Sequence, residues 1–350
     1  MNRRKPARCS LGAVAAVAML SLSGCAFLTG EQSGASGNGE CDERTLRLAT
    51  IRAEDDPTTI GANTFAESVQ RATGGQLTVQ VFPNSQLGDA NDVFAGMSSG
   101  QEVDIFYNGI SLYPTLEGAE AFTVLSVPFL WDSYEQLRAV LNTQRYQELI
   151  DDAAEATGVR VVATEGDAEP RALSANRPVR TADDMRGLDL RIAEAPMPQE
   201  FARALGARPQ VVALSDLYLS LHQGVVDAQE NGAITMVNQS LMEVQSHFMS
   251  TDYIRDVQAW YFSDQVWNSL CAPQQQAIKA EAAAAGEVVT GEVSKQLDEA
   301  RNTLRGQLEI VEVDTESFRT ALSGVFDQFD GEMWPAGLLA ETRQLAAEHS

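Results

Sequence analysis

Residues 45–107 read TLRLATIRAEDDPTTIGANTFAESVQRATGGQLTVQVFPNSQLGDANDVFAGMSSGQEVDIFY and decide the fold class. Apolar residues in this stretch recur with the period of β-strands, at 45–51, 77–82 and 103–107. A helical pattern begins at Pro57 and ends at Gly74, and a shorter helix is predicted over 92–97. The alternation of strands and helices predicts an α/β domain with a mostly parallel sheet.

A second group of short strands follows further along the chain. We predict these strands at 158–164, 171–175, 188–192, 226–230 and 308–313. Residues 273–305 are rich in Ala, Glu, Gln and Lys and predict one helix, roughly 45 Å long at 1.5 Å per residue. Because such a helix can bridge two domains, we expect two α/β lobes joined by several crossovers, with a cleft between them.

The N-terminus is typical of an export signal. Residues 1–8, MNRRKPAR, are basic, and the apolar run at 11–22 is too short to span a bilayer, which needs about 20 residues. The following LSGC resembles the lipobox of bacterial lipoproteins, in which Cys25 is acylated. The sequence therefore predicts a lipoprotein signal peptide over 1–24, with an ordinary signal peptide as the alternative. The Gly- and Ser-rich segment that follows predicts a flexible tether over 25–43.

The composition excludes several classes of function. The formal net charge of −24 argues against nucleic acid, whose phosphates attract basic surfaces, and against adhesion to anionic lipid by charge. An anionic ligand would need a few arginines that overcome this field locally. The histidines are three and form no HExxH motif, and the cysteines show no metal-ligand spacing. We therefore expect no enzyme activity, no cofactor and no metal site.

Two cysteines remain beyond the lipidation candidate, Cys41 near the end of the expected tether and Cys271 far along the chain. A disulfide between them is chemically permitted outside the cytoplasm. Such a bond would tie the start of the fold to a much later segment. The sequence leaves open whether these two residues pair or stay as free thiols.

Four blocks, in order, carry a resemblance to a known family. They are FAESVQRATGGQLTVQVFPNSQLGDANDVFAGMSSGQEVDI (65–105), SVPFLWDSYEQL (126–137), ANRPVRTADDMRGLDLRI (175–192) and LGARPQVVALSDLYLSLHQGVVDAQEN (205–231). Together they resemble the DctP-like extracytoplasmic solute receptors of tripartite ATP-independent periplasmic (TRAP) transporters. The resemblance implies a periplasmic-binding-protein-like fold that closes on a small organic acid and then docks on a permease of one small and one large membrane subunit.

The resemblance also implies lobe boundaries and binding residues. We expect lobe I at 44–167 plus 257–296, and lobe II at 168–256 plus 297–350. Arg191, in DLRIA, stands where the family's arginine reaches the ligand carboxylate, and a guanidinium matches two carboxylate oxygens with parallel donors. Arg171 matches a second family arginine, which either shares the ligand's charge or forms a structural salt bridge. The amide of Asn231 either contacts the ligand or closes a turn.

Three further residues bear on the binding site that the resemblance implies. Leu214 stands where many relatives have Phe, so an aromatic floor under the ligand is expected to be missing. Glu194 follows Arg191 by three residues and either pairs with it or recognises a hydroxyl or ammonium group of the ligand. Asn108 is a weaker candidate, from a loop after a strand in lobe I.

Other functions remain as alternatives. A receptor of the same fold could serve an ATP-driven (ABC) transporter or a membrane sensor, and an exported enzyme could use the same cleft. We expect the TRAP receptor for an organic acid, placed outside the cell membrane and held there by its lipid anchor. The sequence does not identify the acid.

Overall fold

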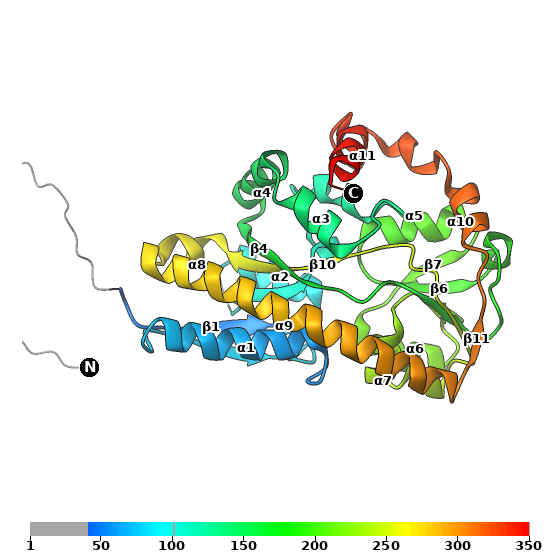
Figure 1. The fold of residues 1–350 in the computed structure, drawn as a ribbon, viewed down its shortest axis with the longest axis horizontal. Coiled ribbons are helices and arrows are strands. Elements are labelled where there is room, and N and C mark those ends of the chain that lie inside the picture. The colour runs from blue at the N-terminus through cyan, green and yellow to red at the C-terminus, as the bar shows by residue number, and fades with distance from the viewer. Residues whose placement is uncertain (1–40, 101, 350) are drawn as a thin grey trace, which may run out of the picture. The chain divides into compact units, whose positions relative to one another are not determined.

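The computed structural model describes residues 41–100 and 102–349. The expected signal peptide at 1–24, the lipidation candidate Cys25 and most of the expected tether at 25–43 lie outside the described residues. Two β-sheets organise the described chain, and helices pack around both (Figure 1).

The first sheet has the strand order β2-β1-β3-β10-β4. Its strands are β1 (Arg44–Ala49), β2 (Leu77–Phe82), β3 (Ile105–Gly109), β4 (Val159–Asp167) and β10 (Val257–Ser263). β1 pairs in parallel with β2 and β3, as predicted, but β10 is inserted antiparallel between β3 and β4. The sheet is therefore mixed, because a strand that returns from the second sheet enters it in the opposite direction.

Two capped helices follow β1 and β2. Helix α1 (Pro57–Ala72) begins after Asp56, whose Oδ1 accepts a hydrogen bond of 2.8 Å from the main-chain N–H of Thr58. Helix α2 (Ala90–Ser98) begins after Asp89, which forms a capping box with Asp92. Both caps place an acidic residue at the end of a loop that leaves the carboxyl end of a strand.

The second sheet has the strand order β11-β9-β5-β8-β6-β7. Its strands are β5 (Leu173–Ala175), β6 (Asp189–Ile192), β7 (Arg208–Val211), β8 (Ala228–Gln229), β9 (His247–Met249) and β11 (Glu309–Val311). β6 is parallel to β7 and β8, whereas β5 is antiparallel to β8 and β9.

The chain passes between the two sheets after β4, after β9 and along helix α9 (Ala272–Arg305). At 1.5 Å per residue, the 34 residues of α9 span about 50 Å. Along its earlier part the helix packs against α1 and β4, and towards its end it packs against α7 (Ala233–Asn238) and β11 (Figure 1). The predicted fold of two α/β lobes with crossovers and a long bridging helix is confirmed.

The remaining helices lie around these sheets. The α-helices are α3 (Tyr134–Leu141), α4 (Gln144–Thr157), α5 (Pro196–Ala204), α6 (Leu217–His222), α8 (Asp264–Ser269), α10 (Thr315–Leu322) and α11 (Leu338–Glu348). Short 3₁₀ helices occupy Ile110–Thr115, Glu120–Ser126, Ala182–Met185, Leu214–Asp216, Leu241–Glu243 and Val325–Phe329. Helix α11 packs against α3 and α4, where Gln136 Nε2 donates to the carbonyl oxygen of Ala346 at 2.9 Å. This segment was expected to belong to lobe II, and the lobe boundaries stay a prediction.

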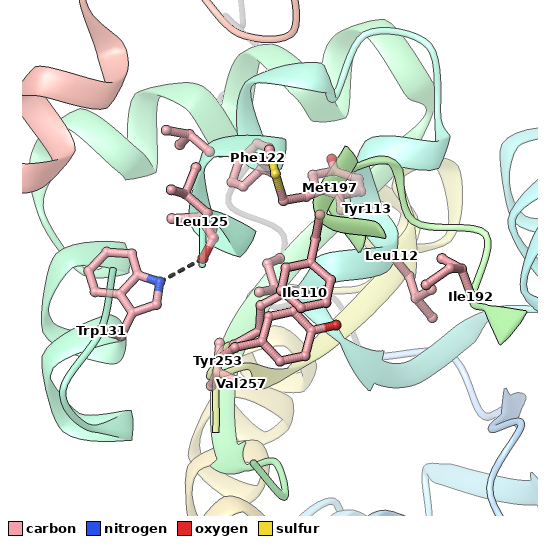
Figure 2. Packing of buried hydrophobic residues seen from close by; sticks show 14 of the residues in the cluster. Ile110, Leu112, Tyr113, Phe122, Leu125, Trp131, Ile192, Met197, Tyr253 and Val257 are labelled. Atoms are coloured by element: carbon pink, nitrogen blue, oxygen red, sulfur yellow. Dashed lines mark hydrogen bonds between the residues drawn. The ribbon is translucent and has the colours of Figure 1, made fainter. Parts of the chain in front are cut away.

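An apolar cluster connects the segments of the two sheets on one side. Figure 2 shows Leu112, Tyr113 and Phe122, from the 3₁₀ segments after β3, close to Ile192 and Met197 from β6 and α5. All of these side chains are buried. Apolar packing against these 3₁₀ segments therefore holds the end of β6 in place.

The start of the fold is held by a disulfide. Cys41 and Cys271 are bonded, with an S–S distance of 2.00 Å, and Cys271 is the residue that precedes α9. The bond thus joins the segment before β1 to the start of the bridging helix, and the structure supplies the pairing that the sequence left open.

Candidate functional site

The candidate site consists of two hollows lined by residues that lie on strands of both sheets or in the segments that follow them. The first hollow has an empty volume of about 440 Å³, part of it open to solvent, and is lined by Arg52, Asp56, Glu169, Arg171, Asn231, Asp256 and Gln258, among others. The second hollow has about 320 Å³ and is lined by Ile51, Ser85, Asp89, Leu112, Arg191, Glu194, Val212 and Leu214, among others.

Arg191 lies on β6 and lines the second hollow. Its neighbours Leu190 and Ile192 are wholly buried in the core, and Arg191 itself is only 2% exposed. Nε donates a hydrogen bond of 2.9 Å to the carbonyl oxygen of Val212. Within the described chain, Nη1 and Nη2 have no hydrogen-bond partner, and Arg191 makes no ion pair. The guanidinium therefore presents a charged edge without a protein partner to the cleft.

The electrostatic state of Arg191 reflects this lack of a partner. The pKa of Arg191 is lowered to about 10: burial is the largest cause and the charges of Arg171 and Arg52 act in the same direction, whereas Glu230 and Glu194 oppose them. The side chain is still protonated at neutral pH. A buried cation without a directly bound acid is the state that an anionic ligand stabilises.

Arg171, in contrast, has a partner within the protein. Its Nη1 donates to both carboxylate oxygens of Glu230, at 2.7 and 2.9 Å, and the hydroxyl of Tyr253 donates to the same carboxylate at 2.7 Å. Burial alone would lower the pKa of Arg171, but the charges of Glu230, Tyr253 and Asp256 and the hydrogen bonds to Glu230 together raise it. Arg171 lines the first hollow with its charge already neutralised.

Asn231 is held with one polar atom free. Its main-chain N–H and its Nδ2 both donate to Oε1 of Gln229, at 2.6 and 2.8 Å. Gln229 is itself fixed by a hydrogen bond from its Nε2 to the hydroxyl of Ser174, at 2.9 Å. The Oδ1 atom of Asn231 accepts no hydrogen bond from the described residues, and Asn231 lines the first hollow. Asn231 can thus accept a donor group of a ligand.

Glu194 and Leu214 both line the second hollow beside Arg191. Glu194 makes no hydrogen bond or ion pair with any described residue. Burial and the neighbouring charge of Asp89 raise the pKa of Glu194, whereas Arg191 lowers it. Leu214 contributes an aliphatic surface at the position where we expected an aromatic floor under the ligand to be missing.

Asn108 lies elsewhere. It is buried in β3, its Oδ1 accepts from the main-chain N–H of Gly109 at 2.9 Å, and its Nδ2 is buried without a partner among the described residues. It lines neither hollow. The structure therefore does not bring Asn108 together with the other five candidates.

Two polar residues of the first hollow were missed by the sequence reasoning. Arg52 donates from Nη1 to the hydroxyl of Thr235 at 3.2 Å, while its Nε is buried without a partner in the described chain. The Oε1 atom of Gln258, on β10, is also buried without a partner in the described chain. Arg52 could have been found, because it directly follows a predicted strand, where ligands of α/β sheets collect. Gln258 lies inside a strand and gives no such signal.

Glu169 closes the same hollow from the crossover after β4. Its carboxylate accepts hydrogen bonds from the main-chain N–H groups of Ile234 and Thr235, at 2.6 and 3.0 Å, and from the Thr235 hydroxyl. Burial raises the pKa of Glu169, while Thr235 and the charge of Arg52 lower it. This carboxylate links a crossover segment to the start of α7.

The described residues give little support to catalytic chemistry. They contain no group of three or more His, Cys, Asp or Glu side chains arranged to hold a metal ion. A GxSxG spacing at 96–100, GMSSG, escaped the sequence reasoning, but Ser98 is the exposed last residue of α2. In hydrolases the serine of this motif stands at a turn from strand to helix, which differs from the position here.

Comparison with known proteins relates this chain to solute-binding proteins. The profile of the family described as "bacterial extracellular solute-binding protein, family 7", DctP, matches residues 48–332. A solute-binding protein of Roseobacter denitrificans is 30% identical over 86% of this chain and 91% of its own length. The C4-dicarboxylate-binding periplasmic protein DctP of Rhodobacter capsulatus is 28% identical over 87% of this chain and 91% of its own.

A solved structure supports the match. The crystal structure of a TRAP periplasmic solute-binding protein from Roseobacter denitrificans, with bound L-galactonate, is 28% identical, with a TM-score of 0.79 over 89% of this chain and 99% of its own. Among the described residues, no helix combines the length and the apolar character needed to span a bilayer. The chain belongs to the DctP family of TRAP extracytoplasmic solute-binding proteins, which are not enzymes.

Proposed function

We propose that this receptor binds a small organic acid through the carboxylate, which is held by Arg191. The observation that carries the proposal is the buried side chain of Arg191, which lines the second hollow and whose Nη1 and Nη2 have no partner among the described residues. Two parallel N–H donors match the two oxygens of a carboxylate, and desolvation strengthens the ion pair. A relative named for C4-dicarboxylates and a similar structure with bound L-galactonate support the same chemical class.

The other cleft residues would orient the rest of the ligand. Asn231 offers a free acceptor oxygen, and Arg171 offers Nε and Nη2, which make no hydrogen bond within the described chain. Because Glu230 balances its charge, Arg171 is expected to act as a hydrogen-bond donor more than as a counter-ion. Glu194 and Leu214 line the hollow beside Arg191. Asn108 is the weakest candidate, since contact with a ligand would require it to become exposed.

Ligand binding is proposed to close the two lobes. With lobe I at 44–167 plus 257–296 and lobe II at 168–256 plus 297–350, Arg52 and Gln258 would approach the ligand from one side, and Arg191 and Asn231 from the other. Closure would exclude water from the ion pair. It is favoured only by contacts that the open form lacks, so residues contributed by the opposite lobe determine how strongly the ligand shifts the equilibrium.

The experiment that tests the proposal is calorimetric titration of the purified protein with organic acids. Arg191→Ala should lose on the order of 2–5 kcal/mol of binding free energy, because a buried carboxylate would be left without its counter-ion. Arg191→Lys should also bind poorly, since a lysine cannot reproduce the forked geometry. Arg71→Ala, which removes an exposed arginine from α1, is the matched control and should bind as the wild type does. A loss below tenfold in Arg191→Ala would contradict the proposal.

We further propose that acylated Cys25 anchors the mature protein outside the cell membrane, and that the closed receptor delivers its ligand to a TRAP permease with one small and one large membrane subunit. Replacement of Cys25 by Ser should release the protein from the membrane fraction. Uptake of the ligand should require both membrane subunits together with this receptor. Uptake that continued without either subunit would favour an ABC transporter or another system.

A further inference from the structure

We infer that the ligand of this cleft carries a single carboxylate, together with hydrogen-bond donors such as hydroxyl or ammonium groups, and no second anionic group. The inference rests on the proposed function and narrows its substrate class. It follows from the balance of charged groups that line the two hollows, in which acidic side chains outnumber the arginines.

The three arginines of the cleft differ in how far the protein already neutralises them. Arg171 is bound by both oxygens of Glu230, and that carboxylate is wholly buried. Arg52 meets Glu169 at the hydroxyl of Thr235, which both side chains contact. Arg191 has neither an ion pair nor a hydrogen bond from its terminal nitrogens within the described chain. Arg191 is therefore the arginine that the protein itself neutralises least, and a single carboxylate is enough to balance its charge.

The acidic side chains that line the hollows oppose a second negative charge. Besides Glu169, they are Asp56 and Asp256 in the first hollow, and Asp89 and Glu194 in the second. Asp56 and Asp89 accept hydrogen bonds from the N-terminal N–H groups of α1 and α2, and Asp256 accepts from Ser111. A second anionic group of the ligand would lie among these charges.

Glu194 is the group that would read the rest of the ligand. It shares the second hollow with Arg191, comes from the loop after β6, and has no partner among the described residues. Asp89 reaches the same hollow from the loop before α2, on the side of the first sheet. A carboxylate accepts hydrogen bonds but donates none, so hydroxyl and ammonium groups fit here and a carboxylate or phosphate does not. Glu194 is thus assigned as a specificity-determining residue.

Matched pairs of acids give the sharpest test. L-Galactonate and galactarate differ only at the terminal carbon, which is an alcohol in the first and a carboxylate in the second, and erythronate and meso-tartrate form a shorter pair. A thermal-shift screen of aldonates, dicarboxylates, phosphate esters and zwitterionic amino acids would first find the strongest binder, and its one-carboxylate and two-carboxylate forms would then be titrated by calorimetry. We expect the strongest binder to have one carboxylate, and the dianionic twin to bind at least tenfold more weakly. Aldonates and zwitterions are separate arms of this screen, so they distinguish hydroxyl from ammonium donors.

Glu194→Gln provides the variant, because the amide keeps the size of the side chain and removes its charge. In this variant, the ratio of the affinity for the one-carboxylate acid to the affinity for its two-carboxylate form should fall at least threefold. Glu316→Gln removes the same charge from an exposed position of α10 and should leave the ratio unchanged. A strongest binder with two anionic groups, or an unchanged ratio in Glu194→Gln, would overturn the inference while leaving the proposed function intact. Failure of every organic acid to bind, or binding that survives Arg191→Ala, would instead overturn the proposed function.

Discussion

Replacement of Arg191 by methionine should stabilise the ligand-free protein and abolish ligand binding. Burial lowers the pKa of Arg191 by more than two pH units from its ordinary value, to about 10. The folded protein releases this proton at a lower pH than the unfolded chain does, so the charged form is disfavoured in the folded state at every pH below about 10. At 1.36 kcal/mol per pH unit, folding carries a penalty on the order of 3 kcal/mol at neutral pH.

Methionine removes the charge and keeps a long, unbranched side chain that adapts to an apolar surrounding. The variant also loses the hydrogen bond from Nε to the carbonyl of Val212, an opposing effect of about 1 kcal/mol. The expected net gain in the free energy of unfolding is therefore about 1–2 kcal/mol. For a chain of this size, that gain should raise the melting temperature by on the order of 2–4 °C.

The measurement is the unfolding of ligand-free protein at pH 7, by denaturant and by calorimetry, after refolding to remove any bound acid. Arg171→Met is the informative control, because it strands the buried carboxylate of Glu230 and should destabilise the protein by roughly 3–5 kcal/mol. The reasoning is refuted if Arg191→Met lowers the free energy of unfolding as much as Arg171→Met does. Retained ligand binding by Arg191→Met would refute it as well.

Three further outcomes test other parts of the structure. Reduction of the disulfide, which closes a loop of 230 residues, should lower the free energy of unfolding by about 2–5 kcal/mol, and equal melting temperatures with and without reductant would contradict this. Burial raises the pKa of Asp167 to about 7, so the folded protein binds more protons than the unfolded chain between about pH 4 and 7, and stability should fall as the pH rises through this window. Asp167→Asn should flatten this slope in denaturant titrations at a series of pH values, and an unchanged slope would exclude the assignment. Gly232→Ala should destabilise the protein by about 1–3 kcal/mol, because the added Cβ would lie 2.5 Å from Glu169 Oε2 and 2.6 Å from the carbonyl oxygen of Pro170, and wild-type stability would show that this crossover segment yields easily.

The sequence predicted well those elements that carry a long periodic signal. The strand expected at 77–82 is β2 at the same residues, and the helix expected at 273–305 is α9, one residue longer at its start. Each of these segments repeats its pattern over several periods and has a clear boundary signal, such as Pro57 before α1 or Pro273 at the start of α9.

Prediction was poorer in two regions, for different physical reasons. The strands of the second sheet are short, and β8 has only two residues, too few for a period to be visible. The 3₁₀ segments Ile110–Thr115 and Glu120–Ser126 were not predicted, because their apolar residues show no clear period and they pack against each other, with β10 beside the first and α5 beside the second. Tertiary contacts, more than local propensity, determine these elements.

The charge pairing in the candidate site could not be predicted from the sequence either. The sequence places Arg171 and Arg191 in similar apolar surroundings, and nothing local distinguishes the arginine that keeps its charge free. The distinction depends on Glu230, which lies next to Asn231 and directly after β8, and which the fold directs toward Arg171. A strand shifted by one residue would turn Glu230 to the other face of the sheet and exchange its place with a neutral neighbour. Which of these two arginines lacks an acidic partner among the described residues is therefore a consequence of strand register, and in a chain with a net charge of −24 that register leaves Arg191 buried without an ion pair.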